Sequence, residues 1–200
     1  MAAPTCGMSA PAFREHRSPG SCRARATLTC LLIERYIRDV PDFPKPGILF
    51  KDITPLLSSA EGLKSTIDAL QELVSPDDYD LVCGVESRGF IFGTALALSV
   101  GKGFVPIRKP GKLPWKTASE SYELEYGTDT LEIHTDAAEQ GKRMLMVDDL
   151  LATGGTMEAA IKLVKKIGGE PVASLFVIEL DFLEGRKRLA PPTHSLLHVG

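Results

Sequence analysis

Apolar positions along the chain recur either at helical spacing or in short continuous runs, and the two patterns alternate. The spacing and the residues at its ends predict helices at 28–38, 60–74, 89–99, 156–167 and 181–189. Apolar runs typical of buried strands lie at 79–85, 104–107, 143–147 and 172–180. Strands that alternate with helices indicate an α/β fold with a central parallel sheet flanked by helices.

Three segments depart from that alternation. Residues 121–126 and 130–134 alternate polar and apolar positions around Gly127-Thr128-Asp129, which predicts a β-hairpin. The Pro-rich stretch 41–46 predicts an extended link, and 109–119 a polar loop. Because binding sites in parallel sheets lie beyond the carboxyl ends of the strands, we expect functional residues in the loops that follow the strands.

The composition fits one compact soluble domain. A chain of 200 residues with 44% hydrophobic content can bury a single core. The net charge of -3 and the pI near 5.8 argue against a general nucleic-acid binder, which needs a basic face. The cysteines, Cys6, Cys22, Cys30 and Cys83, lack metal-ligand spacing and are interpreted as free thiols. We expect a cytoplasmic protein without nucleic-acid or membrane partners, because the apolar segment 90–100 is too short to span a bilayer.

The first 27 residues differ in composition from the rest. Four arginines stand against a single acid, with Ser, Pro and Gly between them. This composition permits an organellar transit peptide and equally fits a disordered extension, which we favour over targeting. We therefore predict an extension at 1–27 and a single domain at 28–200.

The run Met-Val-Asp-Asp-Leu-Leu-Ala-Thr-Gly-Gly-Thr at 146–156 joins a buried strand, two acids and a small loop. In the loop, backbone N–H groups and two hydroxyls can converge on one phosphate. The residues of this phosphate loop are Ala152, Thr153, Gly154, Gly155 and Thr156. Asp148 and Asp149, expected at the strand end, suit vicinal sugar hydroxyls or Mg²⁺. The run lacks the Walker lysine and the spaced glycines of a dinucleotide fingerprint, so it predicts a phosphorylated sugar as ligand.

Four further motifs stand in order around this loop, at 41–55, 86–90, 107–114 and 122–127. Together with the run at 146–156 they resemble the adenine phosphoribosyltransferases of the type I phosphoribosyltransferase family. The resemblance covers about 31–197. It implies the type I fold, with a small N-terminal hood and a flexible β-hairpin loop over the site. It also implies the reversible, magnesium-dependent reaction of adenine with phosphoribosyl pyrophosphate to give AMP and diphosphate.

The resemblance and the chemistry together assign roles to individual side chains. Departure of diphosphate from a cation-like sugar calls for placed positive charge. The residues expected to meet the diphosphate are Glu86, Ser87, Arg88, Arg108, Lys109 and Lys112. Of these, Arg88 and Lys112 are predicted to be catalytic.

Leu49, Phe50 and Lys51 are expected to line the adenine, with Phe50 as the stacking face and backbone groups reading the amino edge. Many relatives carry Arg at the Lys51 position, which leaves the role of Lys51 open. Glu125 is predicted to handle the proton at adenine, with Tyr126 beside it in the flexible loop.

Magnesium is expected to bind mainly through phosphoribosyl pyrophosphate, with contacts through water to Asp148 and Asp149, and no residue is assigned as a direct ligand. The resemblance implies a homodimer, in which the loop near Arg108 helps to complete a neighbour's site. Two alternatives to adenine transfer stay open: a transferase for another base, and a non-catalytic regulator that senses phosphoribosyl pyrophosphate.

The assignment of Glu125 predicts the result of Glu125→Gln. Loss of the proton-handling carboxylate should lower kcat by about 10²-fold or more, while the KM for phosphoribosyl pyrophosphate stays nearly constant. Steady-state kinetics with adenine measures both constants, and near-normal turnover would remove Glu125 from the chemistry.

Overall fold

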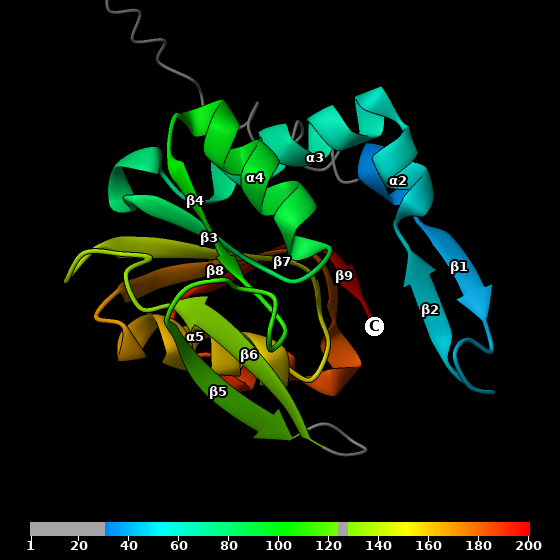
Figure 1. The fold of residues 1–200 in the computed structure, drawn as a ribbon. Coiled ribbons are helices and arrows are strands. Elements are labelled where there is room, and N and C mark those ends of the chain that lie inside the picture. The colour runs from blue at the N-terminus through cyan, green and yellow to red at the C-terminus, as the bar shows by residue number, and fades with distance from the viewer. Residues whose placement is uncertain (1–30, 124–127) are drawn as a thin grey trace, which may run out of the picture.

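The computed structural model describes residues 31–123 and 128–200. A parallel sheet of five strands forms its centre, in the order β4-β3-β7-β8-β9 (Figure 1). The strands are β3 (Leu81–Val85), β4 (Gly103–Ile107), β7 (Arg143–Leu151), β8 (Glu170–Leu180) and β9 (Thr193–Val199). The predicted central parallel sheet is confirmed.

Helices cover both faces of this sheet (Figure 1). α3 (Ala60–Leu73) and α4 (Gly89–Val100) pack on one face, and α5 (Gly155–Lys166) packs on the other. The antiparallel hairpin of β5 (Thr117–Glu123) and β6 (Thr128–His134) lies against α5. The two-layer cover explains the uninterrupted apolar runs of the strands, since both faces of each strand are buried.

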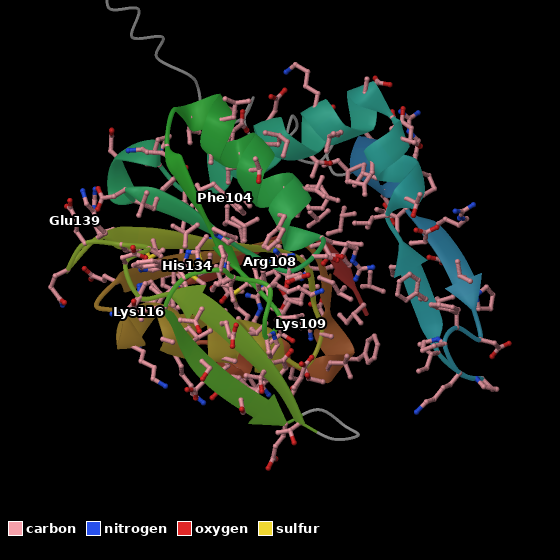
Figure 2. All side chains as sticks on the ribbon, viewed as in Figure 1. Phe104, Arg108, Lys109, Lys116, His134 and Glu139 are labelled. Atoms are coloured by element: carbon pink, nitrogen blue, oxygen red, sulfur yellow. The ribbon has the colours of Figure 1, made fainter. Side chains whose placement is uncertain are left out.

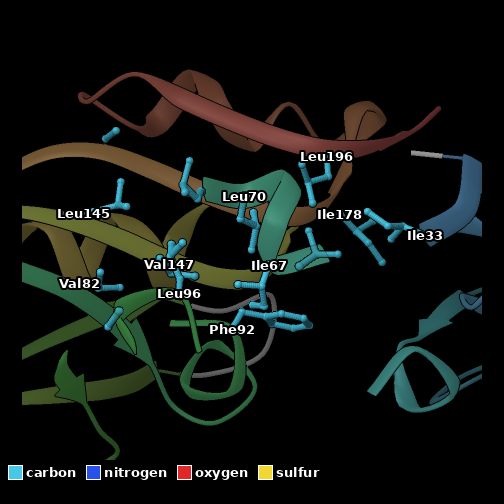
Figure 3. Packing of buried hydrophobic residues seen from close by; sticks show 14 of the residues in the cluster. Ile33, Ile67, Leu70, Val82, Phe92, Leu96, Leu145, Val147, Ile178 and Leu196 are labelled. Atoms are coloured by element: carbon cyan, nitrogen blue, oxygen red, sulfur yellow. The ribbon is translucent and has the colours of Figure 1, made fainter. Parts of the chain in front are cut away.

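Alternate residues of the central strands point into two separate cores. Val82, Leu145 and Val147 join the core beneath α3 and α4, which Figure 3 shows from close by. Their neighbours Met144 and Met146 are fully buried in the core beneath α5. This arrangement follows from the two-residue period of a strand.

The N-terminal part differs from its prediction. Only residues 31–34 of the expected helix 28–38 are helical in the described part, and a strand, β1 (Arg38–Pro41), follows. β1 pairs antiparallel with β2 (Leu49–Asp52), so the Pro-rich stretch is the turn of a hairpin rather than an extended link. The short helix α2 (Thr54–Ser58) connects this hairpin to α3. In Figure 1 the hairpin of β1 and β2 stands beside the main sheet. We call this hairpin, residues 38–52, the hood.

Two ion pairs join β1 to β2 and favour a strand where a helix was predicted. Arg38 Nη2 lies 2.6 Å from Asp52, and Lys51 Nζ lies 2.6 Å from Asp39. Both pairs join residues in direct register across β1 and β2. Helical spacing of apolar residues alone cannot reveal such partners.

The C-terminal part also departs from expectation. The predicted helix 181–189 is two short 3₁₀ turns, η2 (Asp181–Leu183) and η3 (Gly185–Arg188), because Glu184 between them adopts a positive φ of 51°. The edge strand β9 was not predicted, since polar residues interrupt its apolar positions. A further 3₁₀ turn, η1 (Pro76–Asp78), precedes β3, and β5 begins inside the predicted polar loop.

None of the helices within 31–123 and 128–200 is long and apolar enough to cross a bilayer. The predicted extension at 1–27 lies outside the described residues, and the domain boundary at residue 28 stays a prediction.

Candidate active site

The candidate site lies where the chain changes direction across the sheet. From the central pair β3 and β7, one half of the fold continues to β4 and the other to β8 and β9. The loops after β3 and β7 therefore diverge and leave a crevice at the carboxyl ends of the strands. A cavity of about 480 Å³ occupies it, lined by 86–88 and 148–157 with Lys109, Tyr122 and Phe176.

The phosphate loop forms one wall of this cavity, and all five of its predicted residues line it. Gly154 has a positive φ of 81°, and α5 begins at the next residue. The helix therefore starts at the cavity, where its first N–H groups lack partners within the helix. Such an N-terminus attracts an anion through these donors and through the helix dipole.

The two acids lie within β7 and not at its end, because the strand continues through Leu150 and Leu151 in register with β8. The backbone N–H of Asp149 donates to Asp148 Oδ1 at 2.9 Å. Burial raises the pKa of Asp148 well above its ordinary value, and the neighbouring Asp149 carboxyl raises it further. Burial also raises the pKa of Asp149, although the Arg88 guanidinium opposes that shift. The pair therefore favours ligands that donate hydrogen bonds or carry positive charge.

Arg88 joins three parts of the site. It precedes α4 in the loop after β3, and its Nε lies 2.8 Å from Asp149 Oδ2 across the crevice. Its guanidinium carbon also lies 5.7 Å from the ring centre of Phe50 in the hood, within cation–π range. The Arg88 side chain is 38% exposed, so its remaining donors are open to a ligand.

Glu86 contacts the basic loop that follows β4, of which Figure 2 labels Arg108 and Lys109. Its carboxylate accepts hydrogen bonds from Arg108 Nε at 3.2 Å and from the backbone N–H of Lys109 at 2.8 Å. Burial by itself would raise the pKa of Glu86, but these two partners lower it overall. Glu86 thus orients cationic residues and offers no donor to an anion.

The predicted cationic residues divide into two groups. Lys109 lines the cavity, but its ammonium pairs with Asp129 of β6, which also accepts from Tyr122 Oη at 3.2 Å. Arg108 and Lys112 do not line the cavity. The guanidinium of Arg108 contacts Glu86 and donates to the Lys112 carbonyl at 3.1 Å, and the Lys112 side chain is exposed.

The predicted adenine residues lie on β2, outside the cavity lining. Phe50 is the one that reaches the site, through Arg88, and its ring meets Phe43 edge-on at 5.2 Å. Leu49 is exposed, and Lys51 lines a second cavity of about 420 Å³ between the hood and β9. The remaining predicted residues, Glu125 and Tyr126, lie outside the described residues.

Comparisons with known proteins agree with this geometry. Residues 56–193 match the model of the phosphoribosyl transferase domain. The adenine phosphoribosyltransferase of Thermotoga petrophila is 61% identical over 157 residues, which cover 78% of this chain and 92% of that protein. The chain belongs to the adenine phosphoribosyltransferase family.

Solved structures of other members superpose closely. The adenine phosphoribosyltransferase of Thermoanaerobacter pseudethanolicus has a TM-score of 0.82 at 51% identity, covering 85% of this chain and 99% of that one. The Saccharomyces cerevisiae enzyme, solved with an imino-altritol bisphosphate and adenine, has a TM-score of 0.82 at 40% identity, covering 86% and 99%. The type I phosphoribosyltransferase fold is therefore confirmed.

Sequence reasoning missed two aromatic residues of the lining, Tyr122 and Phe176. Tyr122 stands in a recognised motif, but only the register of β5 with β6 brings it opposite Asp129. Phe176 is almost fully buried in β8 and resembles any other core residue in the sequence. Alternation along the hairpin could have indicated Tyr122, whereas no local signal indicated Phe176.

The acid pair predicts a trade-off between stability and binding in Asp148→Asn. Because the folded-state pKa of Asp148 is raised above 3.8, ionisation of this group lowers stability as pH rises through its folded-state pKa. Asparagine cannot ionise and can still accept the bond from Asp149, so the variant should unfold at a higher temperature than the wild type at pH 7. Binding of ribose 5-phosphate, measured by calorimetry, should weaken by about tenfold or more as a sugar-hydroxyl acceptor is lost.

The matched control is Asp136→Asn, at an exposed aspartate outside the cavity lining. It should change neither the unfolding temperature nor ribose 5-phosphate binding. A lower unfolding temperature for Asp148→Asn at pH 7 would contradict the assigned direction of the pKa shift.

Proposed function

We propose that this protein catalyses adenine phosphoribosyl transfer, in which adenine and phosphoribosyl pyrophosphate give AMP and diphosphate in purine salvage. The observation that carries this proposal is the phosphate loop facing Arg88 across the crevice, with the acid pair between them. Membership of the adenine phosphoribosyltransferase family supports the choice of adenine as the base.

The phosphate loop binds the 5′-phosphate of the sugar, through the N–H groups at the start of α5 and the hydroxyls of Thr153 and Thr156. Asp148 and Asp149 accept hydrogen bonds from the vicinal ribose hydroxyls. Burial of the carboxylates supports this role, because the donated bonds replace lost hydration.

Ser87, Arg88 and Lys109 bind the diphosphate, since all three line the cavity. The C–O bond to diphosphate breaks as the anomeric carbon becomes cation-like, and the departing group becomes strongly anionic. Charge-assisted hydrogen bonds to that group favour its departure. The Lys109 ammonium leaves its ion pair with Asp129 and binds the diphosphate instead. Glu86 keeps the backbone of the basic loop in place by accepting a hydrogen bond from the Lys109 N–H.

Adenine stacks on Phe50, whose ring also contacts Arg88. The backbone of Leu49 and Lys51 reads the exocyclic amino edge, and an oxo purine would present the wrong polarity there. Glu125 removes or returns the proton of the base, with Tyr126 beside it. Arg88 thereby links the base and the diphosphate positions.

Magnesium is the proposed cofactor. The donor set fits it, because carboxylate oxygens are preferred by this ion, but Asp149 is already paired with Arg88. The ion would therefore be held mainly by the oxygens of phosphoribosyl pyrophosphate, and Asp148 and Asp149 would contact it through water. When bound, it neutralises charge on the diphosphate.

A different acidic cluster does not serve this purpose. Among the described residues, Glu179, Asp181 and His198 bring possible metal-binding atoms within 4.8 Å of one another. None of them lines the cavity, and Glu179 already accepts hydrogen bonds from Arg186 and Ser195. The cluster is not assigned to magnesium.

We also propose a homodimer in the cytoplasm. The free buried thiol of Cys83 supports a reducing compartment.

α4, of sequence GFIFGTALALSV, is apolar on all sides, although Ile91 and Leu98 are 39% and 82% exposed. A helix of this composition is typically buried on both sides, so a second copy would cover the outer face of α4. Since Arg108 does not line the cavity of its own chain, we propose that its loop helps to complete the neighbour's site.

The dimer predicts the behaviour of Leu98→Glu. A charge on the exposed face of α4 should separate the subunits, so sedimentation equilibrium should give about the 21.6 kDa of one chain where the wild type gives twice that mass. Phe182→Glu, the same kind of change at another exposed hydrophobic residue, should remain dimeric. A monomeric wild type would contradict the proposal.

The reaction predicts that diphosphate is released most efficiently with adenine. Purified protein with phosphoribosyl pyrophosphate and magnesium is supplied in turn with adenine, hypoxanthine, guanine and orotate, and diphosphate is measured. A mismatched buried pair costs about 1 to 3 kcal/mol, so adenine should exceed hypoxanthine by one to two orders of magnitude in kcat/KM. A higher kcat/KM with another base would reassign the substrate, and binding of phosphoribosyl pyrophosphate without turnover on any base would indicate a regulator.

A further inference from the structure

The phosphate loop is in close contact with a segment that the proposed reaction does not use. Gly154 of the loop and Gly185 of η3 meet backbone to backbone. A Cβ at Gly154 would lie 2.5 Å from the Gly185 carbonyl oxygen, and a Cβ at Gly185 would overlap the carbonyl of Ala152. Each segment therefore limits where the other can lie.

η3 is in turn joined to the end of β8 by an ion pair whose carboxylate is buried. Arg186 donates from Nε and Nη2 to the two oxygens of Glu179, both at 2.6 Å. The Glu179 side chain is 2% exposed, and Ser195 of β9 donates to it at 2.6 Å. Glu179 also stands in register with Leu151, the last residue of β7 before the phosphate loop. The fork of Arg186 thus ties η3 to the strand pair from which the loop departs.

A second ion pair fastens η3 to the helix on the other side of the loop. Arg188 Nη2 lies 2.7 Å from Glu158 Oε2, and Glu158 stands in the first turn of α5. The phosphate loop connects β7 to α5. η3 therefore spans both ends of the loop and touches its middle at Gly154.

We propose that Gly185, Arg186 and Arg188 form a brace that positions the phosphate loop for the 5′-phosphate of the substrate. This inference rests on the proposed function, because it assigns the loop a phosphorylated sugar. The brace touches no substrate; it acts by keeping the N–H groups of the loop in one arrangement. Preorganised donors need no rearrangement when the anion binds, and this strengthens binding.

The kinetic signature of a brace differs from that of a catalytic group. The 5′-phosphate is far from the bond that breaks and is held alike in the ground state and the transition state. Loosening the loop should therefore raise the KM for phosphoribosyl pyrophosphate and change kcat much less. A general loss of folding would lower the amount of active enzyme without this separation.

The experiment compares variants of the full chain by calorimetry with ribose 5-phosphate and by steady-state kinetics. Gly185→Ala forces the brace away from Ala152 and Gly154. The double variant Glu179→Gln/Arg186→Met removes the ion pair without leaving a lone buried charge. Arg186→Lys keeps the charge but loses the fork. Lys187→Ala is the matched control, because its ion pair with Glu184 is exposed.

Gly185→Ala and the double variant should weaken ribose 5-phosphate binding and raise the KM for phosphoribosyl pyrophosphate about tenfold or more, with kcat within about threefold of the wild type. Arg186→Lys should fall between these variants and the wild type, and Lys187→Ala should match the wild type. Thermal denaturation confirms that each variant is folded at the assay temperature. If Gly185→Ala does not fold, the double variant and Arg186→Lys decide.

Wild-type affinity for ribose 5-phosphate in the folded double variant would overturn the brace, as would an equal fall in kcat and kcat/KM. Failure of the wild-type protein itself to bind ribose 5-phosphate would instead refute the proposed function. The two failures are therefore distinguishable in one set of titrations.

Discussion

The parallel pairing of β3 with β7 is the contact on which the rest of the site depends. It forms the middle of the sheet, and the chain departs from it in opposite directions. Because both strands end at the same edge, Arg88 after β3 comes within 2.8 Å of Asp149, two residues before the end of β7. The crevice between the two loops is a consequence of this topology. If β3 and β7 were not neighbours in the sheet, Arg88 would lie apart from the acid pair and the phosphate loop.

Burial of carboxylates at the same edge has a cost in stability. Asp148 and Asp149 are adjacent acids in a strand otherwise made for a core, and burial raises the pKa values of both. Arg88 forms an ion pair with Asp149, while Asp148 accepts a hydrogen bond from the Asp149 backbone N–H and feels the Arg88 charge without pairing with it. Natural proteins retain such unfavourable groups where ligands need them. The acid pair therefore marks the place where binding, rather than packing, determined the residues.

The peripheral segments position this centre from both sides. The hood brings Phe50 over Arg88, and η3 supports the phosphate loop from behind through Gly185. Each contains an ion pair: Lys51 pairs with Asp39 within the hood, and Arg186 of η3 pairs with Glu179 of β8. Surface ion pairs contribute little to stability, but the buried Glu179 pair defines a geometry that an apolar contact would leave loose.

The parallel sheet, the phosphate-loop motif and the family could be predicted from the sequence. Those features are local: apolar runs, helical spacing and a short motif are all written in neighbouring residues. Prediction from the sequence was wrong where pairing between distant residues decides the conformation. In the hood, Arg38 pairs with Asp52 in a β-hairpin, whereas its local sequence predicted the end of a helix. Prediction also missed β9, whose polar residues resemble a loop until the strand pairs with β8.

Which charged residues face the crevice depends on contacts between distant parts of the chain. Arg108, Lys109 and Lys112 look equivalent in the sequence, yet Glu86 and Asp129 engage the first two differently, and only Lys109 lines the cavity. The contact between Gly154 and Gly185 has no sequence signal either, since a glycine reveals its neighbour only when two distant backbones meet. Local spacing determines elements and motifs, whereas the position of a charge depends on partners that only folding brings together.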